Sequence, residues 1–458
     1  MRRENAIIDS PLEQLDPLIA KAIGGEAERQ RQAINLLAPS MFLPRAARQA
    51  LSSVLNDLDA EGYAGDWQDS SNRVDLDDFC KSYDQRGPRK YNPSGPFAEY
   101  VELTAARRIA RLFSSGTGLK PEQLHVNVQP LSGSAANIAI LRALLEPGDS
   151  LLSLELASGG HLSHGAGFHY SGATYKVSHY GIPSGGRLDL DQFQARVRES
   201  QPEAVIVGGS SYPRAIDWKA IREAINQVSR PPILIADVAH FAGLIAAGCY
   251  PNPLPFADVV SMVGYKTFAG PRIGTIITHD PDLARKINRA VFPGTQSAPV
   301  MGAIAALAVA ARIAQTDDFR LLMRQAIINA QALSEALLNE RLQIEFGGTD
   351  THMLLVRLAR PTSQVVSSLE RVGILTNSNM LPGDAGPMEA HGIRMGTVGI
   401  TQLGLSESSA TELGRLLAGM ICSTGDVQGD VADRLREEVR AFVRENLQTP
   451  DIFARGYI

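Results

Sequence analysis

The 458 residues of the chain are 44% hydrophobic and 20% charged, and the formal net charge is −5. This length exceeds one compact core, so we expect a soluble globular protein of two or three domains. The net negative charge predicts no basic surface that could bind nucleic acid. The sequence contains no run of about 18 or more apolar residues, so we expect no membrane-spanning segment. The start lacks the apolar core of a signal peptide, and Cys80, Cys249 and Cys422 are scattered without disulfide or zinc spacing. These features predict a cytoplasmic protein with reduced thiols.

Residues 1–60 predict an N-terminal helical arm, with helices at 12–22 and 45–58. Residues 66–96 are polar and rich in turn-forming residues, which predicts a long loop of the kind that is usually functional or disordered. Helical periodicity resumes at 97–113.

Residues 61–318 predict a large α/β domain, because short apolar runs alternate with helical stretches from residue 124 onward. Nearly continuous apolar strands indicate a mainly parallel sheet, here of seven strands, that helices cover on both faces. The strands are predicted at 125–128, 150–155, 174–177, 204–208, 233–237, 259–263 and 274–278. The helices between them are predicted at 134–145, 190–200 and 218–228.

Residues 319–458 predict a small α+β C-terminal domain, which a helical, alanine-rich segment at 299–340 joins to the large one. Its strands are predicted at 353–358 and 393–397, and its helices at 363–372 and 407–421. From Asp430 the pattern predicts an amphipathic helix, which a tail at 451–458 follows.

Two charged residues follow predicted strands of the large sheet, where ligands of such sheets bind. Asp237 ends one strand, and Lys266 comes shortly after a later one. A lysine can form a Schiff base with pyridoxal phosphate (PLP), and a carboxylate can keep the pyridine nitrogen protonated, so that bonds at an amino acid's Cα weaken. A surface lysine behind a core strand is the simpler interpretation of Lys266 alone, but the surrounding residues favour the cofactor.

Three loops after predicted strands add polar groups. Ser132 and Ser134 flank the start of a helix, whose free N–H groups can bind phosphate, although a plain turn is the alternative. His161 and His164 lie in a glycine-rich loop. Because no third ligand has suitable spacing, we predict no metal and interpret His161 as a cofactor contact; His164 could equally be a loop histidine with internal partners. Ser210 could bond the cofactor or lie in an exposed turn.

Arg394 lies inside an apolar predicted strand of the C-terminal domain. A buried arginine needs an anionic partner. Two partners remain open: the α-carboxylate of an amino-acid substrate, held by a bidentate pair, or an internal salt bridge.

The order and spacing of these residues resemble the serine hydroxymethyltransferase family, which are PLP enzymes of the aspartate-aminotransferase-like fold. The resemblance spans roughly residues 12–420. The matching runs are 59–65, 127–130, 159–165, 237–248, 250–253, 266–272, 291–294 and 392–397. The resemblance implies a large PLP-binding domain, a small C-terminal domain and a homodimer with shared active sites, or a tetramer.

The resemblance also implies a role for each cofactor residue. Lys266 would hold PLP covalently, Asp237 would pair with its ring nitrogen, and His161 would stack on its ring. The other implied cofactor contacts are Ser132, Gly133, Ser134, Ser210, His240 and, from the neighbouring subunit, Gly294.

On the substrate side, the resemblance implies that Arg394 binds the substrate carboxylate and that Glu61 handles the β-hydroxyl proton. Asn379 would match an asparagine that binds the pterin of tetrahydrofolate.

The sequence departs from the family pattern on this same side. The residue before the lysine is Tyr265 instead of the usual histidine, and we keep it as a candidate catalytic residue. Asp59 replaces a tyrosine two positions before the glutamate, and Pro39-Ser40 replaces a Ser-Glu pair. Only Tyr91 offers a substitute for the family's twin tyrosines. These changes leave open whether tetrahydrofolate takes part.

The sequence therefore predicts a PLP-dependent enzyme that breaks or transfers the Cα–Cβ bond of a β-hydroxy amino acid of the serine, threonine and glycine class. The alternative is a relative from specialised metabolism that needs no folate. Such a relative would be a threonine transaldolase or an enzyme of PLP-dependent decarboxylation, β-elimination or oxidative deamination. A non-catalytic scaffold is the third hypothesis.

Overall fold

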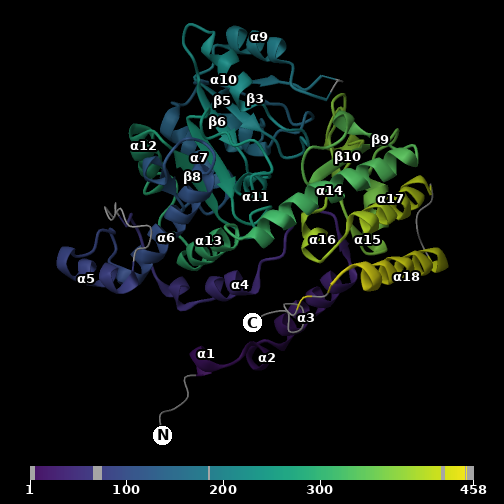
Figure 1. Ribbon diagram of the computed structural model, residues 1–458, viewed down its shortest axis with the longest axis horizontal. Helices are drawn as coiled ribbons and strands as arrows, with labels where there is room; N and C mark the ends of the chain where they lie inside the picture. Colours follow the sequence, from purple (N-terminus) through teal and green to yellow (C-terminus); the bar gives the residue numbers. More distant parts are fainter. Residues whose placement is uncertain (1–5, 65–74, 184–185, 424–428, 449, 451–458) are drawn as a thin grey trace.

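The structure is a computed structural model that describes residues 6–64, 75–183, 186–423, 429–448 and 450 (Figure 1). The strands are β1 (Ile34–Asn35), β2 (His125–Asn127), β3 (Ser150–Leu154), β4 (Lys176–Tyr180), β5 (Ala204–Gly208), β6 (Ile233–Asp237), β7 (Val259–Val263), β8 (Gly274–Thr278), β9 (Gln343–Ile344), β10 (Met353–Arg357), β11 (Ile374–Leu375), β12 (Asn377–Asn379) and β13 (Gly392–Gly396). The α-helices are α1 (Ala6–Asp9), α2 (Leu12–Leu15), α3 (Pro17–Gln32), α4 (Arg45–Leu51), α5 (Leu76–Arg86), α6 (Gly95–Ser114), α7 (Gly133–Leu144), α8 (Tyr170–Thr174), α9 (Leu190–Ser200), α10 (Trp218–Asn226), α11 (Ala242–Ala246), α12 (Pro281–Val291), α13 (Met301–Ile313), α14 (Asp317–Asn339), α15 (Ser363–Arg371), α16 (Val398–Gln402), α17 (Glu407–Cys422) and α18 (Gly429–Asn446). Short 3₁₀ turns occur at η1 (Val54–Asp57), η2 (Pro121–Gln123), η3 (Leu162–His164), η4 (Glu345–Gly347) and η5 (Pro387–Glu389).

The large sheet has seven strands in the order β2-β8-β7-β6-β5-β3-β4. The strands from β4 to β7 pair in parallel, and β8 runs antiparallel to both β7 and β2. The predicted α/β fold with a mainly parallel seven-stranded sheet is therefore confirmed. Every residue of β5, β7 and β8 is buried, which is why these strands show as unbroken apolar runs in the sequence.

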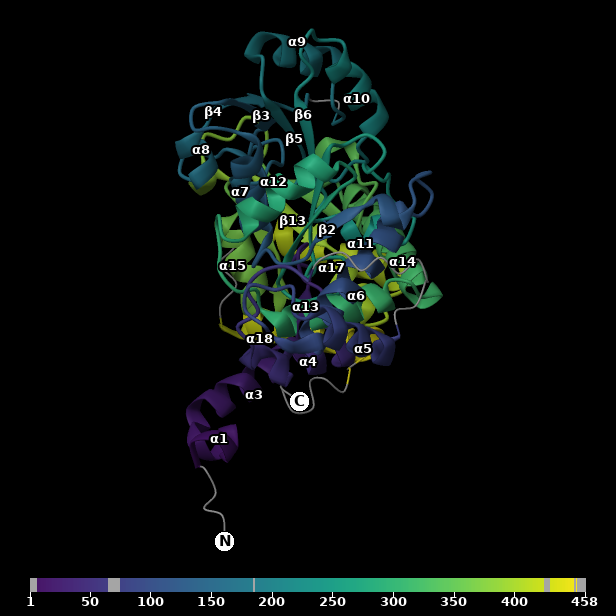
Figure 2. The same cartoon turned by 90° about the vertical axis from the view of Figure 1, so that its left-hand side faces the viewer.

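Helices cover both faces of this sheet (Figures 1 and 2). Successive strand side chains point to opposite faces. On one face Leu151 and Ile206 pack in the core that includes Ile140 of α7 and Ile287 of α12. On the other face the alternate strand residues, such as Val205, join a larger core with α6, α9, α10 and α13.

The predicted strand at 174–177 starts too early, because α8 ends at Thr174 and β4 begins at Lys176. The short helix α8, with the sequence Tyr-Ser-Gly-Ala-Thr, precedes the strand here, and its composition predicts neither a helix nor a strand strongly.

The C-terminal part has its own antiparallel sheet, in the order β12-β13-β10-β9. It packs with α14, α15 and α17 around a separate core, so the predicted small α+β unit is also present. A two-stranded parallel sheet ties the N-terminal segment to it, with Ile34 of β1 opposite Ile374 of β11. None of the helices in the described ranges is both long and apolar enough to cross a membrane.

The N-terminal helices project from the body of the molecule (Figures 1 and 2). The predicted helix at 12–22 is divided, because Pro17 starts α3 and Asp16 caps it by accepting a 3.1 Å hydrogen bond from Ile19 N. The predicted helix at 45–58 ends early, at Leu51. The hydroxyl of Ser53 bonds back to a carbonyl of α4, and only the 3₁₀ turn η1 follows.

The prediction of one long loop at 66–96 is wrong over α5. This helix begins after Asp75, whose carboxylate accepts hydrogen bonds from the N–H groups of Asp77 and Asp78. Phe79 is its one buried side chain, so the helix has too narrow an apolar stripe for periodicity to reveal it. Residues 65–74 and the predicted tail at 451–458 lie outside the described residues.

Candidate active site at the carboxyl edge of the large sheet

Lys266 lies three residues beyond β7 and is only 6% exposed. Burial lowers the pKa of its ammonium group to about 8; the charge of Asp237 opposes this shift, and those of Arg394 and Arg272 add to it. A substantial fraction of the side chain is therefore the neutral amine near physiological pH, which is the form that can attack an aldehyde.

Asp237 is the last residue of β6, and two side chains donate hydrogen bonds to its Oδ2 atom. These bonds come from Asn137 Nδ2 at 2.8 Å and His164 Nε2 at 2.7 Å. Burial alone would raise the pKa of Asp237, but the hydrogen bonds from His164 and Asn137 outweigh it and hold the pKa below the usual carboxyl range. The carboxylate is therefore fixed in place and ionised.

His161 belongs to the same network through Ser163, whose Oγ lies 2.8 Å from both His161 Nδ1 and Asn137 Nδ2. Burial, together with the charge of His164, lowers the pKa of His161 to about 4, so its ring is neutral. The sequence left the role of His164 undecided and gave no role to Asn137, yet both side chains hydrogen-bond to Asp237. Within the described ranges, no three His, Cys, Asp or Glu side chains are grouped to hold a metal ion.

The Ser132–Ser134 turn starts α7 directly beside β7. Ser132 Oγ caps the helix by accepting a 3.1 Å hydrogen bond from Ala135 N. The backbone is tightly approached here, since a Cβ at Gly274 would lie 2.3 Å from Ser132 O. The first N–H groups of a helix have no intrahelical acceptor, so this end of α7 is suited to a phosphate.

Arg394 on β13 points its guanidinium at neutral groups. Its Nε donates to Asn377 Oδ1 at 3.0 Å, and its Nη1 donates to Ser210 O at 2.7 Å and Ser210 Oγ at 3.2 Å. Burial lowers its pKa to about 10, which leaves it charged. None of the ion pairs among the described residues involves Arg394, so the structure shows no internal salt bridge for it. Asn379, on the adjacent strand β12, donates to Ser211 Oγ at 3.0 Å.

His240 is buried near Lys266 and stacks on His352, with ring centroids 5.9 Å apart and planes 16° apart. His352 Nε2 donates to Ala38 O at 3.2 Å. Burial lowers the pKa of both imidazoles, so both are neutral. The Nδ1 atom of each ring is buried and has no hydrogen-bond partner among the described residues.

The ring of Tyr265 lies close to two basic side chains. The guanidinium carbon of Arg272 is 4.3 Å from its ring centroid, and Lys266 Nζ is 5.8 Å away. The aromatic face of Tyr265 therefore lies beside Lys266, where it attracts positive charge.

Glu61 belongs to a second group, which we call the glutamate cluster: Asp59, Glu61, Asn92 and Ser297. Asn92 Nδ2 donates to Glu61 Oε2 at 3.2 Å and to Asp59 Oδ2 at 3.0 Å, and Ser297 Oγ donates to the other Glu61 oxygen. No hydrogen bond or ion pair of the described residues joins Glu61 to Lys266.

Tyr91 and Gly294 also lie with the glutamate cluster. Tyr91 precedes Asn92, and its ring lies 6.3 Å from that of Phe292, two residues before Gly294. Within the described ranges, no hydrogen bond or ion pair joins this cluster to the other group, which we call the lysine cluster: His161, Ser210, Asp237, His240, Lys266 and Arg394.

A buried lysine that the sequence did not single out supports the glutamate cluster. Lys90 Nζ donates to the carbonyls on either side of Glu61, Ala60 O at 3.2 Å and Gly62 O at 3.0 Å, and forms an ion pair with Glu102. Gln129 closes the network with bonds to Gly62 O and Glu102. Lys90, which holds the backbone on both sides of Glu61, thus lies in a stretch whose polar composition predicted a loop.

A comparison with known proteins agrees with this geometry. Residues 12–417 match the family model described as serine hydroxymethyltransferase. The chain is 38% identical to a serine hydroxymethyltransferase of Myxococcus xanthus over 421 residues, which cover 91% of this chain and 92% of that protein. It is 38% identical over 420 residues to the enzyme of Clavibacter sepedonicus (90% and 91% covered). For the enzyme of Psychrobacter cryohalolentis the identity is 36% over 444 residues (95% and 97% covered). The chain therefore belongs to the serine hydroxymethyltransferase family of PLP-dependent transferases.

Proposed function

We propose that the protein breaks and forms the Cα–Cβ bond of a β-hydroxy amino acid such as serine or threonine, with PLP as its cofactor. The observation that carries the proposal is the lysine cluster, in which a lysine of lowered pKa lies near an ionised carboxylate and near Arg394, an arginine that has no acidic partner among the described residues. Glu61 favours a reaction that begins by removing a hydroxyl proton.

The residues of the lysine cluster fit PLP. The buried Nδ1 atom of His240 has no protein partner in the described part of the chain and can meet a polar ring substituent. Lys266 would hold the cofactor covalently, Asp237 its ring nitrogen, the start of α7 its phosphate, and the neutral His161 its ring face. When bound, PLP withdraws electrons from the Cα of an attached amino acid.

The protein's own groups would then act around the substrate. Arg394 binds the α-carboxylate and thereby sets which Cα bond lies in the reactive orientation, while Ser210 and Asn377 keep the guanidinium in position. Glu61 accepts or returns the proton of the β-hydroxyl oxygen. The Lys266 amine returns a proton to Cα after the bond has broken.

A homodimer with shared active sites is the second part of the proposal, because no hydrogen bond or ion pair of the described residues joins the two clusters within one chain. Large apolar side chains are exposed around the loop that carries Gly294 and Ser297: Tyr91 is 76% exposed, and Leu131 and Val300 are each 46% exposed. Such a patch beside an incomplete site supports contact with a second subunit.

Co-expression of a Lys266→Ala chain with a Glu61→Gln chain tests this arrangement. Half of the randomly formed dimers would be mixed, and each mixed dimer would contain one site with both wild-type residues. We therefore expect about a quarter of wild-type activity from two inactive variants. Activity no higher than that of either variant alone would argue that each chain supplies its whole site.

The reaction itself is tested with purified PLP-loaded protein, which is given serine, threonine or glycine with and without tetrahydrofolate while products are identified by mass spectrometry. We expect aldehyde release from threonine or one-carbon exchange with serine. If none of the three amino acids is turned over, the proposal is wrong.

A threonine transaldolase activity is the second candidate, favoured by the altered glutamate cluster. Asp59 stands where the family has a tyrosine, and Asn92 links it to Glu61. With threonine and benzaldehyde but no folate, this activity would release acetaldehyde and form a phenyl-substituted β-hydroxy amino acid. Strictly folate-dependent exchange between serine and glycine would exclude it.

Replacing Arg394 with glutamine should raise the KM for the amino acid about a hundredfold, because a charge-assisted, bidentate contact to the carboxylate is lost. The absorbance of bound PLP should stay, since Arg394 is not assigned to the cofactor. Steady-state kinetics and a spectrum of the same sample check both points. Loss of the cofactor together with the substrate would contradict the assignment.

Capture of PLP by the apoprotein should accelerate as the pH rises, with a midpoint near pH 8. The lowered pKa of Lys266 means that the reactive neutral amine predominates above this pH and disappears as the pH falls through it. Stopped-flow absorbance between pH 6 and about 10 measures the profile. A rate that is still rising steeply at about pH 10, toward the ordinary lysine pKa of 10.5, would show that Lys266 is not the buried group described above.

A further inference from the structure

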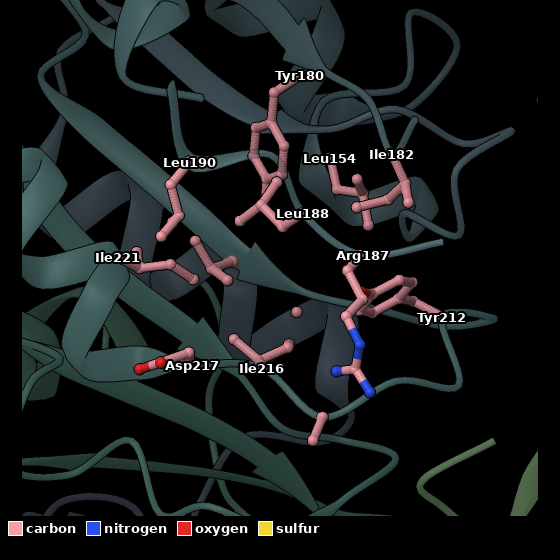
Figure 3. Close-up of a pocket in the computed structure, with 13 residues that line it drawn as sticks. Leu154, Tyr180, Ile182, Arg187, Leu188, Leu190, Tyr212, Ile216, Asp217 and Ile221 are labelled. Atoms are coloured by element: carbon pink, nitrogen blue, oxygen red, sulfur yellow. The ribbon is translucent and has the colours of Figure 1, made fainter. Parts of the chain in front are cut away.

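A cavity of about 240 Å³ lies outside both clusters, at the carboxyl ends of β3 and β5 and beside the start of α10 (Figure 3). Its walls are largely apolar. Leu154 comes from β3, Val207 from β5, Ile216 from the segment before α10, and Ile221 from α10 itself. The cavity is open to solvent at its rim, and its concave, largely apolar wall offers room for a small molecule.

Two hydroxyl groups of the cavity wall already have hydrogen-bond acceptors in the protein. Tyr180 and Tyr212 both line the cavity, but the hydroxyl of Tyr180 donates to Ile206 O and that of Tyr212 donates to Gly186 O, each at 3.2 Å. A ligand body inside the cavity would meet hydrocarbon and aromatic surface, with little to hydrogen-bond. The body of a matching ligand is therefore apolar.

The rim of the cavity supplies one available positive charge. In Figure 3 the side chain of Arg187 extends from beside Tyr212 toward Ile216. It is 63% exposed, and its hydrogen bond to Asp350 is long, at 3.3 Å. Asp350 is held more closely by Arg214, at 2.9 Å, so it does not depend on Arg187.

The acidic side chain at the rim is committed elsewhere. Asp217 is the N-cap of α10, and its carboxylate accepts a 3.0 Å hydrogen bond from the N–H of Ala220. The charge that a ligand can use is thus the guanidinium of Arg187, which pairs with carboxylates.

We propose that this cavity binds a small apolar monocarboxylate, with its apolar body between β5 and α10 and its carboxylate on Arg187. A molecule of about ten non-hydrogen atoms suits the volume, because a cavity of roughly 150 Å³ accommodates benzene. The site differs from the lysine cluster, because no residue of that cluster lines the cavity, although Gly208 in the cavity wall pairs with Asp237 on the neighbouring strand.

Phenylacetate is the probe, titrated by calorimetry into the full-length, PLP-loaded protein. The titration is repeated on the Arg394→Gln variant, so that capture by Arg394 cannot be mistaken for this site. We expect one saturable site in both proteins, with a Kd of about 1 mM or below. The neutral isostere phenylacetamide should bind about fivefold more weakly, because a partly exposed ion pair contributes modestly.

Two kinds of variant then locate the ligand. Arg187→Gln should abolish the preference for phenylacetate over phenylacetamide, whereas Arg196→Gln, an exposed arginine of α9, should keep it. Ile221→Trp should fill the cavity and abolish binding of both compounds. Leu190→Trp does the same from the partly exposed rim, so a failure of the Ile221 variant to fold leaves the test intact.

Binding that disappears in Arg394→Gln but survives in Leu190→Trp would overturn the proposal, and so would the lack of saturable binding up to about 10 mM. These measurements need no turnover. Failure of the proposed amino-acid reaction therefore leaves their outcome unaffected, and failure of phenylacetate to bind leaves the proposed reaction unaffected.

Discussion

Replacing Lys266 with alanine is expected to remove the visible absorbance of bound PLP and to lower turnover of serine or threonine by at least about a thousandfold. The amine of Lys266 is buried, its pKa is lowered to about 8, and no other lysine belongs to the cluster around Asp237. Absorbance spectra after gel filtration and product analysis measure the two effects. The residual activity would report what Asp237 and Arg394 contribute without the covalent link.

The matched control is Lys286→Ala, which removes an exposed lysine from α12. It should keep both the colour and the activity of the wild type. A Lys266→Ala protein that retained tightly bound, absorbing PLP would show that a different amine holds the cofactor. A protein without colour in its wild-type form would instead favour the non-catalytic scaffold.

Replacing Lys90 with methionine is expected to destabilise the protein by about 3–5 kcal/mol, because it leaves a buried carboxylate without its cation. The Lys90 side chain has no exposed surface and pairs with Glu102, which is 9% exposed. Methionine has a similar length but cannot donate to the carbonyls of Ala60 and Gly62. The shift in the midpoint of urea unfolding, at unchanged slope, measures the loss.

Two further variants separate the charge effect from packing. The double variant Lys90→Met/Glu102→Leu removes both charges and should recover most of the lost stability. Lys81→Met, on exposed α5, should change the free energy of unfolding by less than about 0.5 kcal/mol. If the double variant were as unstable as Lys90→Met, the ion pair would not be the cause.

The central sheet was the most predictable part of the fold. The predicted bounds of β5, β6, β7 and β8 agree with the structure, because strands buried on both faces need apolar residues throughout. Elements with a narrow buried face gave weaker signals. The helix α5 was missed for this reason, and capping at Asp16 divided one predicted helix in two.

The sequence predicted the part of the candidate site that lies at the carboxyl ends of strands. Asp237 and Lys266 are brought together because β6 and β7 are parallel neighbours, and the sequence already placed both at carboxyl ends. The supporting residues come from distant segments: His164 reaches Asp237 across 73 positions, and His352 reaches Ala38 across 314. Patterns within a single segment hold no information about such pairs.

The pairing of β1 with β11 has a consequence for how the protein can be cut. Ile34 and Leu36 are fully buried in the core of the C-terminal sheet, and the approach is so close that a Cβ at Gly396 would lie 2.4 Å from Ala38 Cα. A fragment that starts at residue 319 would expose the apolar surface that Ile34 and Leu36 cover and the unpaired edge of β11, so we expect it to aggregate. During synthesis, Ile34 and Asn35 must likewise wait until residues 374 and 375 have left the ribosome before β1 can pair with β11.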